Sequence, residues 1–162
     1  MNRWRRLAAA ALLAASSICV HAGNFAGTVT HVSDGDSLWV RPVSGGRPRE
    51  VRVRGIDAPE ICQHWGRESR EALAAQVLHR QVRVASRGHD NYQRSLADIS
   101  IGGQDVGAWM VSHGHAWSYH FRGDSGPYSK QESQARSARL GLWAENAPMA
   151  PRDFRKRHGS CK

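Results

Sequence analysis

Short runs of alternating apolar and polar residues dominate the first two thirds of the chain. Alternation with a period of two is typical of strands that bury one face. Five runs predict strands, at residues 25–32, 38–40, 51–53, 81–85 and 95–101. Gly45 and Gly46, with prolines on either side, separate the second run from the third and predict a turn between antiparallel neighbours. The pattern therefore predicts a small antiparallel barrel.

Helical spacing of apolar residues begins only in the middle of the chain. About three helices are predicted, over residues 66–80, 106–113 and 128–140. In the first, Leu73 and Val77 form the apolar stripe, and Glu68 lies early, where the helix dipole favours an acid. Gly114 is expected to end the second helix, because glycine is common just beyond a helix C-terminus. The predicted fold class is α+β, a five-stranded barrel with about three helices.

The first 22 residues have the organisation of a signal peptide. Arg3, Arg5 and Arg6 precede an apolar run over residues 7–15, and small residues precede a cleavage point after Ala22. The run is too short to cross a bilayer, although an uncleaved N-terminal anchor is the alternative. We expect a secreted or periplasmic monomer with no membrane attachment after cleavage. Its domain would span residues 23–150, followed by a basic C-terminal tail at 151–162.

The net charge favours a polyanionic partner. The full chain has a formal charge of +9, and cleavage would leave 20 basic and 14 acidic residues, a charge of +6. Nucleic acid is the commonest specific polyanion for a basic domain. Solubility, or adhesion to anionic surfaces, would explain the same charge. Charge alone therefore does not decide between these functions.

Two aspartates are expected to meet beside the predicted hairpin. Asp36 begins one strand and Asp57 follows the other, so antiparallel pairing would bring them close together. Neighbouring carboxylates repel each other unless a cation lies between them. Oxygen ligands suit a hard cation such as Ca²⁺ or Mg²⁺. Arg52 and Glu60 flank Asp57 in sequence, and a guanidinium, a metal and a free carboxylate together can hydrolyse a phosphodiester.

Three motifs in this order resemble those of the staphylococcal nuclease family. They are Asp34-Gly35-Asp36-Ser37, Arg52-Val53-Arg54-Gly55-Ile56-Asp57-Ala58-Pro59-Glu60 and Asp90-Asn91-Tyr92-Gln93-Arg94-Ser95-Leu96-Ala97. The resemblance covers roughly residues 25–143 and implies that the barrel is of the OB-fold type.

The resemblance also implies a Ca²⁺ site and three catalytic residues. The implied roles are metal ligands for Asp36, Asp57 and the backbone carbonyl of Ala58, general base for Glu60, and phosphate electrophiles for Arg52 and Arg94. Gln93 departs from the pattern, because the family usually has glycine at this position. A positive φ there would strain a glutamine and affect the placement of Arg94.

Tyr92 and Tyr119 are candidate substrate-binding residues, because aromatic rings stack on nucleotide bases. Core packing is the alternative for such aromatic residues, and it is the favoured role for Trp117. The resemblance implies hydrolysis of DNA and RNA with 3′-phosphate products. The alternative is a non-catalytic OB-fold nucleic-acid-binding module, which would be expected to lack the catalytic residues.

The cysteines predict one disulfide. Loss of Cys19 with the signal peptide would leave Cys62 and Cys161, an even pair in a compartment where disulfides persist. Joining them would close a loop of about 100 residues and hold the tail beside Glu60. A catalytic Cys62 is disfavoured, because His64 is too close in sequence to be assigned as its base. The nine histidines show no zinc-protease spacing.

Overall fold

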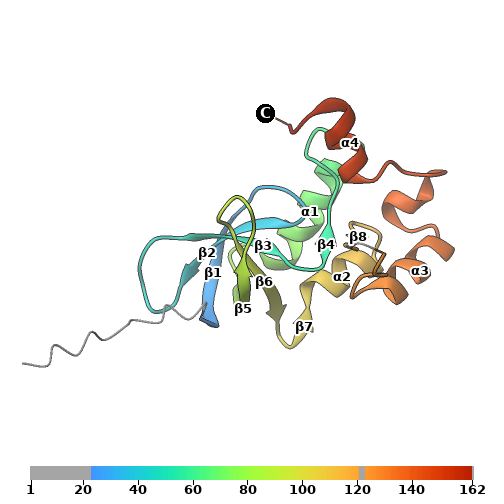
Figure 1. Ribbon diagram of the computed structural model, residues 1–162. Coiled ribbons are helices and arrows are strands. Elements are labelled where there is room, and N and C mark those ends of the chain that lie inside the picture. The colour runs from blue at the N-terminus through green and yellow to red at the C-terminus, as the bar shows by residue number, and fades with distance from the viewer. Residues whose placement is uncertain (1–22, 121–122, 162) are drawn as a thin grey trace, which may run out of the picture.

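The computed structural model describes residues 23–120 and 123–161. Its centre is a sheet that curls into a closed barrel (Figure 1). The strands of this sheet are β1 (Phe25–Val32), β2 (Ser37–Pro42), β3 (Arg49–Val53), β5 (Gln81–His89), β6 (Ser95–Ile101) and the short β7 (Gln104–Asp105). The five predicted strands are all present, and the predicted α+β class with an OB-type barrel is confirmed.

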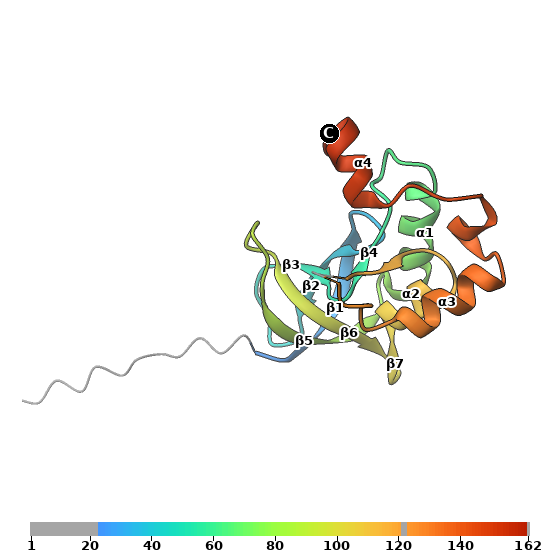
Figure 2. The same cartoon turned by 45° about the vertical axis from the view of Figure 1, so that its right-hand side comes forward.

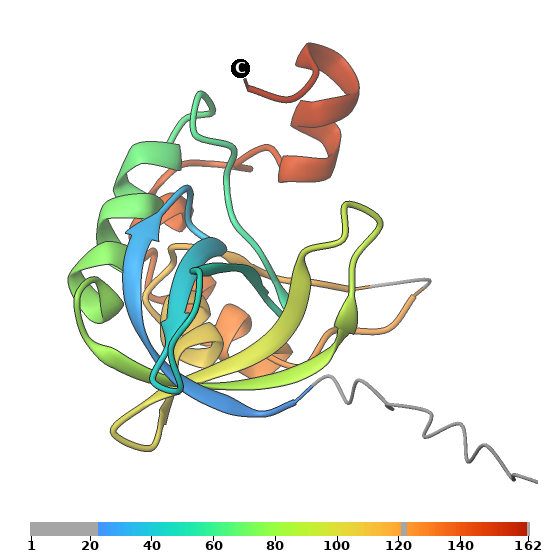
Figure 3. The ribbon, with the colours of Figure 1, turned by 90° about the vertical axis from the view of Figure 1, so that its left-hand side faces the viewer.

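The order of the strands explains how the barrel closes. Neighbours follow the order β3-β2-β1-β5-β6-β7, and a further pairing joins β3 to β6. The β1–β2, β2–β3, β1–β5 and β5–β6 pairs are antiparallel. The closing β3–β6 pair is parallel, with Val51 opposite Ser95. The curled strands are visible in Figure 3.

Alternate residues of the strands fill the barrel. The buried positions include Val29, Leu38, Val40, Val51, Val53, Val82, Val84, Ala97 and Ile99. Because successive strand side chains point to opposite faces, this alternation gives each strand one apolar inner face. The hydrophobic pattern that predicted the strands therefore also forms the core.

The three predicted helices are present and lie on one side of the barrel, with α3 packed on α2 (Figure 2). They are α1 (Gly66–Val77), α2 (Val106–Ser112) and α3 (Ser129–Ser137). Leu73 and Val77 of α1 are buried in the same cluster as the barrel interior. Gly114 has a φ of 73° just beyond α2, as its predicted role at the helix end requires.

Short elements complete the helical side. The two-residue strands β4 (Ile56–Asp57) and β8 (Trp117–Ser118) pair antiparallel. A 3-10 turn, η1 (Gly141–Ala144), follows α3. Trp117 packs edge-on against Trp143, with ring centroids 5.2 Å apart. Trp117 therefore has the packing role that the sequence favoured.

The C-terminal segment, interpreted from sequence as a basic tail, contains a fourth helix, α4 (Pro151–His158). A disulfide joins Cys62 to Cys161, three residues beyond the helix, and confirms the predicted pairing. The bond holds α4 beside the segment that links β4 to α1 (Figure 1).

Residues 1–22, where the signal peptide and Cys19 are predicted, lie outside the described residues. Within the described ranges, none of the helices has the length and apolar character that crossing a bilayer would require.

Replacing both cysteines, as Cys62→Ser with Cys161→Ser, should lower the free energy of unfolding. The expected loss is at most about 4 to 5 kcal/mol, because the cross-link restricts a loop of about 100 residues in the unfolded chain. Urea unfolding of the variant and of the parent measures the difference. Reductant should destabilise the parent and leave the variant unchanged. Equal stability of the oxidised parent and the variant would contradict the prediction.

Candidate active site

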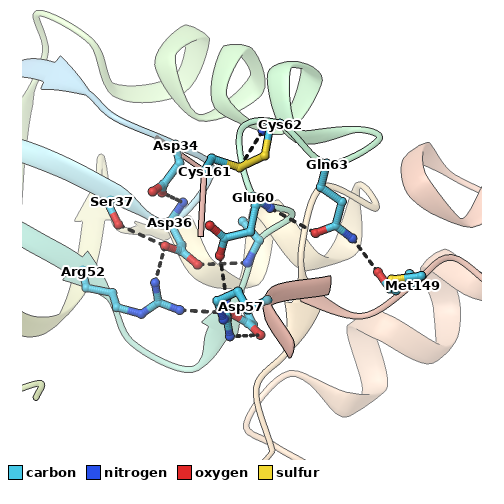
Figure 4. Close-up of polar contacts among 12 residues, drawn as sticks. Asp34, Asp36, Ser37, Arg52, Asp57, Glu60, Cys62, Gln63, Met149 and Cys161 are labelled. Atoms are coloured by element: carbon cyan, nitrogen blue, oxygen red, sulfur yellow. Dashed lines mark hydrogen bonds and ion pairs between the residues drawn. A yellow bond between two sulfur atoms is a disulfide. The ribbon is translucent and has the colours of Figure 1, made fainter. Parts of the chain in front are cut away.

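A cleft of about 950 Å³ lies at the mouth of the barrel. Its walls come from the turn between β1 and β2, from β3, from the segment after β3, from the 90–94 turn and from α4. Acidic and guanidinium side chains converge there, as Figure 4 shows for those near β2 and β4. The cleft therefore brings acidic and basic groups together at one place.

Asp36 and Asp57 lie together, as the hairpin predicted. Ser37 pairs with Arg52 across β2 and β3, which places the Arg52 side chain beside the residue preceding Ser37. Arg52 donates from Nη1 to Asp36 Oδ1 at 2.6 Å and from Nη2 to Asp57 Oδ1 at 3.1 Å. Both carboxylates are buried. One guanidinium thus bridges two acids that are 21 residues apart in sequence.

Two glycines allow the backbone around these acids to pack closely on α1. A Cβ on Gly35 would lie 2.7 Å from Ala58 Cβ and would overlap Ser69 Oγ. A Cβ on Gly66 would overlap the Glu60 carbonyl oxygen. A side chain at position 35 would therefore push residues 34–36 away from the helix, and a side chain at position 66 would push Glu60 away from it.

Asp34, Asp36 and Asp57 form an acidic cluster, which carries more negative charge than its surroundings readily stabilise. Burial and the charge of Asp36 raise the pKa of Asp34 to about 7. Burial and the charge of Asp36 also raise the pKa of Asp57, although Arg155 and Arg52 oppose this shift. An additional cation would relieve the repulsion among these carboxylates.

The donor set fits a hard cation. The Arg52 guanidinium is a cation in contact with both Asp36 and Asp57, so these carboxylates can share one positive ion. The Ala58 N–H donates to Asp36 Oδ2 at 2.9 Å, which places the Ala58 backbone at the same carboxylate. Carboxylate and backbone carbonyl oxygens suit Ca²⁺. In the described part of the chain, no three His, Cys, Asp or Glu side chains form a metal-binding group, so the fit rests on this smaller set.

Arg94 reaches the cleft in spite of Gln93. Gln93 has a φ of 64°, the positive value at which glutamine is strained. Arg94 Nε donates to Asp90 Oδ2 at 2.8 Å, and Nη1 donates to Ser37 Oγ at 3.2 Å. The second contact places the Arg94 guanidinium beside the start of β2, next to the acidic cluster.

Tyr92 and Tyr119 are exposed at the cleft. Their exposed fractions are 80% and 46%, so neither tyrosine packs in the core. Both line the cleft. The Arg94 guanidinium lies 5.4 Å from the Tyr92 ring centroid. Arg54 also lines the cleft, and its guanidinium pairs with Asp98 at 2.7 Å.

Arg155, which α4 brings to the same cleft, was not among the predicted site residues. Its Nη1 donates to Glu60 Oε1 at 2.7 Å, and its Nη2 donates to Asp57 Oδ2 at 3.3 Å. The predicted disulfide was the available signal, because it required the C-terminal segment to lie beside Glu60. The same disulfide leaves Cys62 without a thiol and rules out its use as a nucleophile.

An OB-type barrel with paired carboxylates, a further acid and several guanidiniums in one cleft has the groups that hydrolysis of a phosphodiester requires. Residues 50–145, more than half of the chain, match the family model described as Staphylococcal nuclease homologue. The chain belongs to the staphylococcal nuclease family, and it is a nuclease.

Individual relatives extend the comparison. An uncharacterized endonuclease of Haemophilus influenzae is 36% identical over 128 residues, which cover 79% of this chain and 71% of that protein. A micrococcal nuclease of Shigella flexneri is 33% identical over 163 residues, which cover 93% of this chain and 91% of that protein. CAN4, a probable staphylococcal-like nuclease of Oryza sativa subsp. japonica, is 41% identical over 112 residues, but the match spans only 22% of that longer protein.

Replacing Gln93 by glycine should stabilise the protein. Glycine adopts the observed positive φ without strain, so Gln93→Gly should raise the free energy of unfolding by about 0.5 to 1 kcal/mol. Urea unfolding measures this change. Gln93→Ala is the matched control, because alanine also lacks the long side chain but keeps the strain. If the two variants were equally stable, strain at this position would not explain the result.

Proposed function

We propose that the protein is a secreted or periplasmic, calcium-dependent nuclease that hydrolyses DNA and RNA. The observation that carries the proposal is the contact of one guanidinium, Arg52, with both Asp36 and Asp57 in a cleft that also holds Glu60 and Arg94. The predicted signal peptide and the disulfide support an oxidising compartment. No contact with a second copy is needed to complete this set of residues, and a monomer is proposed.

Asp36, Asp57 and the Ala58 carbonyl would hold the calcium ion. When bound there, the ion would supply positive charge that stabilises the phosphoryl oxygens. The family resemblance supports this assignment, and the buried, mutually repelling carboxylates favour it.

Glu60 would act as the general base. Its carboxylate lies in the cleft, where it can take a proton from a water molecule that attacks phosphorus. The new bond joins the water oxygen to phosphorus, and the bond between phosphorus and the 5′ oxygen breaks. The 5′ oxygen leaves as a hydroxyl after gaining a proton from solvent. The products would carry a 3′-phosphate and a 5′-hydroxyl.

Arg52 and Arg94 would donate hydrogen bonds to the non-bridging phosphate oxygens, where negative charge increases during the attack. Tyr92 and Tyr119 would stack on bases at the edge of the cleft. Contacts to phosphate and flat stacking surfaces carry little sequence information, so cleavage at many sequences is expected.

Plasmid DNA separates the enzyme from a binding module. The purified protein should degrade the plasmid with Ca²⁺ and should stop when a chelator is added. A non-catalytic module would retard the plasmid in a gel without cutting it under either condition. Retardation without cleavage in Ca²⁺ would contradict the proposal.

Glu60→Gln should lower turnover by about 10² to 10⁴, the usual effect of losing a positioned general base. The side chain keeps its size, so Ca²⁺ affinity and unfolding should remain close to those of the parent. Steady-state cleavage of DNA measures the rate. Glu145→Gln changes an exposed glutamate and is the control. A Glu60→Gln enzyme as fast as the parent would remove Glu60 from this role.

Asp36→Asn should shift the calcium titration of activity to higher concentration, by at least about tenfold, because a charged ligand is lost. Binding of DNA without the ion should change much less. Asparagine can still accept the Ala58 N–H bond, which limits structural change. Asp153→Asn, at an exposed position, is the control. An unchanged titration would exclude Asp36 as a ligand.

A further inference from the structure

Helix α4 brings to the cleft a guanidinium that the proposed mechanism does not use. Arg155 bonds through Nη1 to Glu60 Oε1 at 2.7 Å and through Nη2 to Asp57 Oδ2 at 3.3 Å. Its side chain is one-third exposed. Arg155 therefore contacts the proposed base and a proposed metal ligand together, from a helix some 95 residues further along the chain.

Two tethers fix α4 to the segment that follows Glu60. Gln63 Nε2 donates to the Met149 carbonyl at 2.6 Å, just before the helix. The Cys62–Cys161 disulfide closes the other end. Figure 4 shows both connections beside Glu60. Since Cys62 and Gln63 follow Glu60 by only two and three residues, the helix and the proposed base are held as neighbours.

The rotation of α4 about its own axis is also restricted. Phe154 and His158, one turn apart, line a second cavity of about 240 Å³ together with Trp65 and Trp117. Arg155 lines the larger cleft instead. Phe154 and His158 thus face the aromatic residues, while Arg155 faces the active site.

The Glu60 carboxylate is held by one of its two oxygens. Among the described residues, Arg155 is its hydrogen-bond partner, and the bond goes to Oε1. The Oε2 atom has no hydrogen bond to these residues. A glutamate has three rotatable side-chain torsions, so holding one oxygen restricts the position of the other. The arrangement leaves Oε2 available to receive a proton.

We propose that Arg155 is a positioning residue of the nuclease, which holds Glu60 by one carboxylate oxygen so that the other can take a proton from water. The proposal rests on the proposed role of Glu60 as general base. Arg155 acts through Glu60 and needs no contact with the scissile phosphate.

Replacing Arg155 should reduce kcat more than it changes KM. Arg155→Ala should lower kcat by about 10- to 100-fold, since loss of orientation at a reacting group has effects of this size. KM should change by less than about threefold, because substrate contacts remain. Arg155→Lys should recover part of kcat, as its ammonium can still donate to Glu60. Arg157→Ala, on the exposed part of α4, should match the parent.

A double-mutant cycle tests whether Arg155 acts through Glu60. Adding Arg155→Ala to Glu60→Gln should reduce turnover by less than about twofold, because residues that act as a unit have non-additive effects. A full additional loss would overturn the positioning role. A rise in kcat for Arg155→Ala would also overturn it and would show that Arg155 blocks the site.

Calcium binding supplies a measurement independent of turnover. Titration calorimetry without nucleic acid should show that Arg155→Ala binds Ca²⁺ about 3- to 30-fold more tightly, because a positive charge beside Asp57 is removed. Unchanged affinity would show that the Arg155 guanidinium does not lie beside Asp57 and Glu60 in solution, and would overturn the proposal. If Glu60→Gln alone kept full turnover, the proposed function would fail. If Glu60→Gln were inactive while Arg155→Ala kept full kcat, only the positioning role would fail.

Discussion

The ion pairs of Arg52 with Asp36 and Asp57 are the contact on which the active site depends. Two buried carboxylates this close would repel each other and take up protons without a positive partner. Arg52 bridges them from β3 at 2.6 and 3.1 Å. The bridge keeps two acids in one small volume, which is the condition for a shared metal ion.

The barrel provides this arrangement through its hairpin. Pairing of β2 with β3 fixes Arg52 opposite Ser37, and the backbone N–H of Val53 donates to the Asp36 carbonyl at 2.8 Å. β4 follows β3 after a short turn and carries Asp57. The acidic cluster is thus a consequence of strand register, and close packing at Gly35 and Gly66 keeps it against α1.

Local patterns made much of this fold predictable. The strands of the barrel have clear alternation, and the β2–β3 hairpin has a glycine turn, so the meeting of Asp36 with Asp57 followed from sequence. The parallel β3–β6 closure joins segments distant in the chain, and no local pattern encodes it. The strands β4, β7 and β8 have two residues each, too few to show a period. Helix α4 is strongly basic and lacks a continuous apolar stripe, so Arg155 was recognisable only through the cysteine pairing.

The decisive measurement is a crystal structure with calcium and a nucleoside 3′,5′-bisphosphate. We expect one ion bonded to carboxylate oxygens of both Asp36 and Asp57, at about 2.3 to 2.6 Å. A phosphate of the nucleotide should lie between that ion and the guanidiniums of Arg52 and Arg94. A calcium ion bound elsewhere, with the two aspartates still joined only by Arg52 and the phosphate outside the cleft, would contradict this expectation.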